Sequence, residues 1–163
     1  MPLQDLSYVI LWWAVFFVSG ILFLPLASTI FSKFLDKGYG FSKILGVLIV
    51  SYLIFILGIL RVIPFTNYSI YIIFIFTIIP ILAWKGKNYK SLFKPKLLLL
   101  LFIEECIFFL CLLGWSYIRA FNPEIYGLEK YMDFGFVNSI LRSTYFPPVD
   151  MWFSGLPINY YYF

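Results

Sequence analysis

Four long runs of apolar residues dominate the sequence, and each is long enough to cross a lipid bilayer as a helix. They cover about residues 8–31, 44–63, 68–84 and 97–118. A hydrocarbon core roughly 30 Å thick requires about 20 apolar residues in an α-helix. Because backbone hydrogen bonds must be satisfied inside lipid, these runs predict an all-α integral membrane protein with about four transmembrane helices.

The composition excludes several other classes of protein. The 163 residues are 63% hydrophobic and only 12% charged, whereas a soluble domain carries about 25% charged residues. The sequence contains no histidine, which removes the commonest general base and metal ligand. The net charge of +4 comes from lysines at the ends of the apolar runs, so we expect no nucleic-acid partner.

The lysines also predict how the chain is oriented. Two loops, one after the first run and one after the third, contain eight of the twelve basic residues: Lys33, Lys37, Lys43, Lys85, Lys87, Lys90, Lys94 and Lys96. Two crossings separate these loops, so they share a side, which the positive-inside rule makes cytoplasmic. We therefore expect both ends of this chain to lie on the extracytoplasmic side of a plasma membrane.

Two adjacent carboxylates, Glu104 and Glu105, fall near the middle of the fourth run. A charge there costs about 2.5–3.5 kcal/mol on insertion scales, and adjacent helical residues point about 100° apart. At least one should therefore face another helix or a wet cavity. It could serve an ion relay, a polar anchor, or a protonated carboxyl bound to a neighbour. Arg61 lies too far along the membrane normal to pair, which leaves open a partner outside this chain.

Beyond residue 118 the sequence predicts an extracytoplasmic loop, 119–163, that contains a short helix at about 128–143. An apolar stripe recurs there at four-residue spacing: Leu128, Met132, Phe136 and Ile140. A helix of this kind, placed directly after a membrane exit, is typical of one that lies flat in the membrane interface. Pro147 and Pro148 prevent the helix from continuing.

Glu129 and Asp133 are four residues apart on this helix and are therefore neighbours. Two like charges repel unless a positive group lies between them, such as Lys130, Arg142, a substrate cation or a divalent metal. Oxygen ligation without histidine favours Mg²⁺ or Mn²⁺, and Asp150 could approach the same place. The alternative is that these charges form the solvated edge of the helix.

Basic and aromatic residues of the same segment predict contacts with lipid. Arg119, Lys130 and Arg142 could anchor lipid phosphate groups. The stretch INYYYF, which contains Tyr160 and Tyr161, would form either an interfacial aromatic belt or the far wall of an outward-facing pocket.

The stretch EKYMDFGFVNSILRSTYFPPVDMWFSG and the following INYYYF closely resemble the uncharacterised prokaryotic YYY membrane protein family. The similarity runs from about Glu105 to Phe163, with departures at Val149 and Met151, where the family more often has proline. The family pattern continues past the tyrosines into further membrane helices. The resemblance therefore implies a fragment of a larger protein in a prokaryotic plasma membrane, with the remaining helices as partners.

The region also resembles, at the level of architecture, polytopic glycosyltransferases that use lipid-phosphate-linked sugars. That resemblance implies a polyprenyl-phosphate lipid as partner and Asp133 as base or metal-bound orienter of the acceptor. Glu129 would assist, and Arg142 or Lys130 would hold the phosphate. Two alternatives stay open: a non-enzymatic scaffold or transport component that depends on Glu104 and Glu105, or an inactive fragment.

Overall fold

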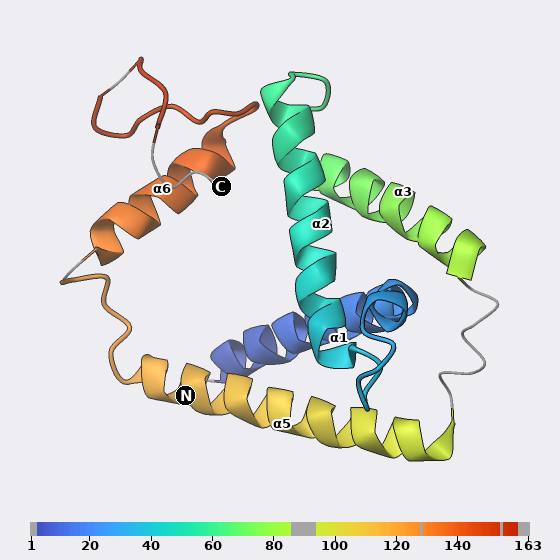
Figure 1. Cartoon of the computed structure of the whole chain (residues 1–163). Helices are drawn as coiled ribbons and strands as arrows, with labels where there is room; N and C mark the ends of the chain where they lie inside the picture. The colour runs from blue at the N-terminus through green and yellow to red at the C-terminus, as the bar shows by residue number, and fades with distance from the viewer. Residues whose placement is uncertain (1–2, 86–93, 128, 154, 160–163) are drawn as a thin grey trace. The chain divides into compact units, whose positions relative to one another are not determined.

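The computed structural model describes residues 3–85, 94–127, 129–153 and 155–159. Its helices, in chain order (Figure 1), are α1 (Leu3–Ile30), α2 (Tyr39–Ile59), α3 (Asn67–Lys85), α5 (Pro95–Ala120) and α6 (Lys130–Arg142). Extended pairing within these described ranges is limited to one antiparallel bridge between Val149 and Pro157. The predicted all-helical fold class is confirmed.

Four of these helices are long and apolar enough to cross a membrane. The candidate spans are Asp5–Ile30, Tyr39–Ile59, Asn67–Trp84 and Pro95–Ala120, which match the four predicted runs. The fifth, α6, has 13 residues and is too short to span a bilayer core of roughly 30 Å. The chain is therefore a multi-pass membrane protein.

α2 begins five residues earlier than the apolar run suggests. Asp36 explains the difference, because its Oδ1 accepts the Gly38 N–H and its Oδ2 accepts the Gly40 N–H, both at 3.1 Å. The first N–H groups of a helix have no partner within the helix. Asp36 satisfies that of Gly40 in the first turn and that of Gly38 directly before it, so the helix can start at Tyr39.

α2 also ends earlier than expected, at Ile59 rather than Ile63. Arg61 adopts a left-handed backbone conformation with φ 55°, and its N–H donates to the Gly58 carbonyl at 3.2 Å. The Val62 N–H reaches back to the Leu57 carbonyl at 2.9 Å. A left-handed residue that closes such bonds is a common way to end a helix.

The chain divides into two compact units, which we describe separately. Unit 1 comprises Met1–Ile49 and Phe76–Pro123; unit 2 comprises Val50–Ile75 and Glu124–Phe163. The predicted division into 1–118 and 119–163 groups the residues differently and stays a prediction.

The core of unit 1 joins α1 to the first part of α2 and to α5. Leu24, Tyr39 and Leu101 are buried together, with Ile21 and Leu97 packed against them. Aromatic rings extend the contact between α1 and α5: Phe16 with Phe108 at 5.9 Å and Trp13 with Phe109 at 5.4 Å, both edge to face.

The core of unit 2 is built around Phe146, which is buried. Its ring centroid lies 5.7 Å from that of Phe55 and 5.3 Å from that of Phe65. The Phe65 N–H donates to the Thr144 carbonyl at 2.7 Å. These contacts fix the stretch that follows α6 to the end of α2.

Candidate functional site

Glu105 lies in a buried ion pair within unit 1. Its Oε2 accepts hydrogen bonds from Lys43 Nζ and from Tyr39 Oη, each at 2.5 Å. The Lys43 and Glu105 side chains are only 8% and 9% exposed. The idea that the partner of Glu105 lies outside this chain is therefore wrong, because α2 supplies it.

Helical spacing explains why Lys43 is available. Because α2 begins at Tyr39, Tyr39 and Lys43 are one turn apart on the same face of the helix, and both donate to the same carboxylate oxygen. The interpretation of Lys43 as a loop residue failed because the apolar run starts only at Ile44. Asp36 followed by glycines was the sequence signal for the earlier helix start.

The surroundings of Lys43 accommodate its charge and its aliphatic stem. Its Nζ lies 3.8 Å from the centroid of the Phe108 ring, a cation–π contact that stabilises a desolvated ammonium. A Cβ at Gly20 would come within 2.9 Å of Lys43 Cγ, so α1 supplies the space for the stem. Lys43 thus contacts α1 and α5 from within α2.

Two carboxylate oxygens near this pair remain without a hydrogen-bond partner in the part of the chain that the structure describes. They are Glu105 Oε1 and Glu104 Oε2, both buried. The Lys43 ammonium and the Glu105 carboxylate neutralise each other's charge. The pair forms an ionic link between α2 and α5, and removing either partner would leave a buried charge uncompensated.

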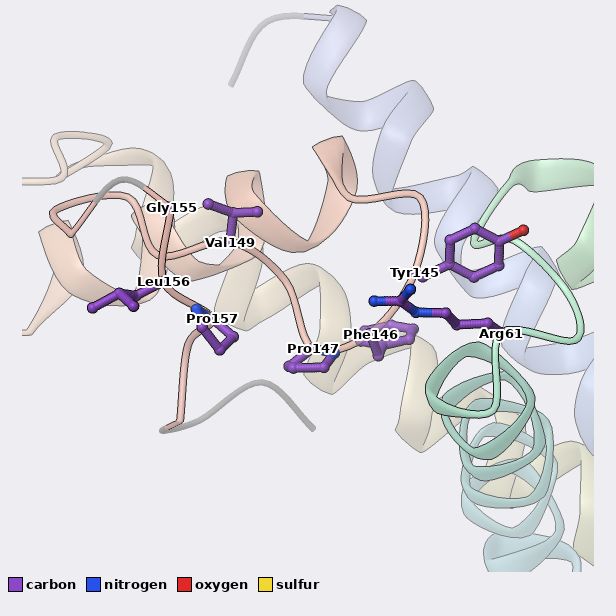
Figure 2. Close-up of a pocket in the computed structure, with 8 residues that line it drawn as sticks. All are labelled: Arg61, Tyr145, Phe146, Pro147, Val149, Gly155, Leu156 and Pro157. Carbon is purple, nitrogen blue, oxygen red and sulfur yellow. The ribbon is translucent and has the colours of Figure 1, made fainter.

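Unit 2 contains a cavity of about 570 Å³. Figure 2 shows its walls, with the Arg61 side chain extending from the loop after α2. The lining residues are Arg61, Tyr145, Phe146, Pro147, Val149, Gly155, Leu156 and Pro157. Among the described residues that line it, Arg61 is the one charged group, and sequence analysis missed it. Its place as a single charge near the end of the second apolar run was the available signal.

The far wall of this cavity is a closed loop. The Asp150 N–H donates to the Leu156 carbonyl at 2.7 Å, and the Ile158 N–H donates to the Pro148 carbonyl at 2.8 Å. The Ser139 hydroxyl on α6 donates to the Val149 carbonyl. These bonds hold the two arms of the loop together and attach them to α6.

The predicted acidic pair lies at the start of α6, away from these walls. Glu129 is the N-cap residue and Asp133 lies in the first turn, and both are exposed. Neither residue lines the cavity. In the described ranges no group of three or more acidic, cysteine or histidine side chains could hold a metal ion. A metal site at Glu129 and Asp133 stays a prediction.

The described members of the predicted apolar stripe, Met132, Phe136 and Ile140, are half-buried or buried. Phe136 is buried, and its ring centroid lies 6.0 Å from that of Trp152. A second stripe faces out, where each side chain is more than half exposed: Phe134, Val137 and Leu141. α6 therefore contacts the 149–153 stretch through Phe136 and leaves the side chains of the second stripe open to their surroundings.

The other predicted residues are spread over both units. Arg142 is in the last turn of α6 and Arg119 in the last turn of α5. Lys130 opens α6. Asp150 binds its own loop, because its Oδ1 accepts the Trp152 N–H at 2.7 Å and the Phe153 N–H at 2.9 Å. Five predicted residues fall outside the described ranges: Lys87, Lys90, Leu128, Tyr160 and Tyr161.

Comparison with known proteins gives one match. Residues 49–163 match the model of an uncharacterised membrane protein family, DUF2298, and this range includes the second part of α2, α3, α5 and α6. No curated protein sequence and no solved structure matches the chain. Because the matched residues make up most of its length, the chain belongs to this uncharacterised membrane protein family.

Proposed function

We propose that the cavity of unit 2 binds the phosphate group of a membrane lipid, with Arg61 as the phosphate-binding residue. The observation that carries this proposal is the contrast within the cavity. A single guanidinium lies among described walls that are otherwise aromatic, proline-rich or aliphatic. An amphiphile with an anionic head and an apolar chain matches both parts.

The position of Arg61 supports a lipid as the source of that phosphate. Arg61 follows the last residue of the membrane-spanning helix α2 by two positions. Basic residues at this level meet the headgroups of the adjoining leaflet. A guanidinium can bind two phosphate oxygens at once, which a lysine ammonium cannot do with the same geometry. A polyprenyl phosphate is the chemical class that we would test first.

Transfer of a sugar from such a lipid is a further step of this hypothesis, and it rests on the resemblance to glycosyltransferases. In that step Asp133 would accept the proton of the acceptor hydroxyl, assisted by Glu129. Both carboxylates are exposed and belong to the same unit as Arg61. The hypothesis predicts that Asp133→Asn abolishes transfer from a polyprenyl-phosphate sugar in membranes, whereas retained activity would reject it.

The binding proposal is tested by titrating a polyprenyl phosphate into the purified chain in lipid nanodiscs, followed by native mass spectrometry. Arg61→Gln should weaken binding by roughly tenfold or more, since hydrogen bonds to a charged group contribute about 1.5–3 kcal/mol. Arg142→Gln is the matched comparison, because Arg142 is an exposed cation of the same unit that does not line the cavity. The resemblance to glycosyltransferases assigns the phosphate to Arg142 or Lys130, so this variant also separates that assignment from ours. Equal weakening by both variants would indicate general charge attraction and would contradict the proposal.

A second candidate function is a non-enzymatic membrane scaffold. The buried Lys43–Glu105 pair favours it, because a carboxylate that is engaged by a lysine and a tyrosine links helices rather than conducts ions. Under this alternative Glu105→Gln should impair assembly in the membrane, while Arg61→Gln should leave both assembly and function unchanged.

A further inference from the structure

Unit 2 presents a cluster of large apolar side chains to its surroundings, which we call the apolar tip. Its members are between 36% and 70% exposed: Val149, Met151, Trp152, Phe153 and Leu156. We propose that the apolar tip inserts into the lipid headgroup region of the leaflet at the Ile59 end of α2. This proposal does not depend on whether the cavity binds a lipid phosphate.

The structure holds the apolar tip in this exposed arrangement. The carboxylate of Asp150 caps two backbone N–H groups of the turn, those of Trp152 and Phe153. Its charge is therefore engaged within the loop instead of projecting from it. Behind the turn, a Cβ at Gly135 would meet the sulfur of Met151, so the tip rests directly on the α6 backbone.

The location of the apolar tip relative to α2 favours lipid. Phe146, three residues before Val149, packs against Gly58 in the last turn of that membrane-spanning helix. Val149 and Leu156 line the same cavity as Arg61, which lies just past the end of α2. The apolar tip therefore projects from the protein at the level where the end of α2 meets the lipid headgroups.

The chemistry of the apolar tip fits this level as well. Tryptophan prefers the boundary between hydrocarbon and water, and phenylalanine and leucine are the apolar residues that interfacial segments bury just beneath it. Arg61, which lines the same cavity as Val149 and Leu156, carries the charge that complements lipid phosphates. A large exposed apolar cluster generally marks an interaction site for a protein or a membrane. At the end of a membrane-spanning helix, the partner that such a cluster meets is the lipid bilayer.

Spin-label accessibility tests this inference on the complete chain. Cys106 and Cys111, both exposed on α5, are first replaced by alanine. A nitroxide is then attached in one variant at Phe153→Cys and in another at Glu129→Cys, an exposed polar position of the same unit. The protein is placed in nanodiscs of phosphatidylcholine and phosphatidylglycerol. Collision rates are measured with oxygen, which partitions into lipid, and with a water-soluble nickel chelate.

We expect the label at position 153 to collide several-fold more with oxygen and several-fold less with nickel than the label at position 129. Equal collision profiles at both positions would place the tip in water and overturn the proposal. Exclusion of both reagents at position 153 would also overturn it, because the tip would then be covered by protein. In the Arg61→Gln background the profile should not change, which separates this result from the lipid-phosphate hypothesis.

Discussion

Gly58 of α2 and Phe146 of the stretch after α6 are in direct contact, with no room for a side chain at Gly58. A Cβ added there would lie 2.5 Å from Cδ2 of the Phe146 ring, a separation that real Cβ atoms essentially never show. The absence of a side chain at one position of a membrane helix thus provides the docking place for a segment that follows almost ninety residues later.

Gly58→Ala should therefore destabilise unit 2. Inserting a methyl group into a close-packed contact costs about 1–3 kcal/mol, and Phe146 would be displaced from Phe55 and Phe65. The free energy of unfolding in mixed micelles measures the effect. Gly114→Ala is the control, since apart from its own helix backbone and chain neighbours nothing in the described part of the chain lies within 4 Å of a Cβ built there. Equal behaviour of the two variants would contradict this account of the contact.

Arg61→Gly should separate stability from ligand binding. The left-handed conformation at Arg61 costs about 1–2 kcal/mol for a residue with a Cβ, and glycine adopts it freely. Part of this cost should be recovered as stability while binding of polyprenyl phosphate is lost. Lys37, with φ 57°, offers a matched comparison. Lys37→Gly should show the same change in stability with unaltered lipid binding.

Lys43→Met and Glu105→Gln should each be strongly destabilising. Either change leaves one buried charge without its counter-charge, at a cost of about 3–5 kcal/mol. The double variant removes both charges and should lose less than the sum of the single variants. Thermal unfolding in detergent is measured for the unaltered chain, the two single variants and the double variant, which together make a double-mutant cycle. Additive losses would show that the two residues do not interact, and Glu104→Gln supplies a neighbouring control.

Asp150→Ala should loosen the turn that carries the apolar tip. Two backbone N–H groups would lose their common acceptor, each worth about 1 kcal/mol. Hydrogen exchange at the amides of Trp152 and Phe153 should accelerate, while exchange in the middle of α6 should not. Asp133→Ala removes an exposed carboxylate and should leave all of these amides unaffected. Unchanged exchange in Asp150→Ala would disprove the capping role.

Hydropathy predicted the four spans because a membrane imposes one dominant requirement on a sequence. Apolar length alone decides whether a segment can span, so the helices could be located without knowledge of their contacts. The first and last residues of the helices were harder to predict. The start of α2 depends on the side chain of Asp36 and its end on the backbone of Arg61, and neither is visible in an average over apolar residues.

The candidate sites were harder to predict because they depend on contacts between distant residues. Glu105 was recognisable as a charge in need of a partner, but Lys43 could be assigned to it only once α2 had been extended back to Tyr39. Arg61 became a candidate because the stretch after α6 folds against the end of α2. Glu129 and Asp133 were proposed because they are four residues apart. The contacts in the described part of the chain give no further support for a site at these two residues.

The separation of Lys43 and Glu105 in the chain, 62 residues, has a consequence for biosynthesis. During synthesis α2 is made before α5, so until α5 is in place we expect Lys43 to keep its charged end at the membrane surface, in water. Burial of the lysine becomes favourable only when α5 brings the carboxylate. We therefore expect membrane insertion of this part of the protein to be completed in two stages, the second of which depends on a helix that is made later.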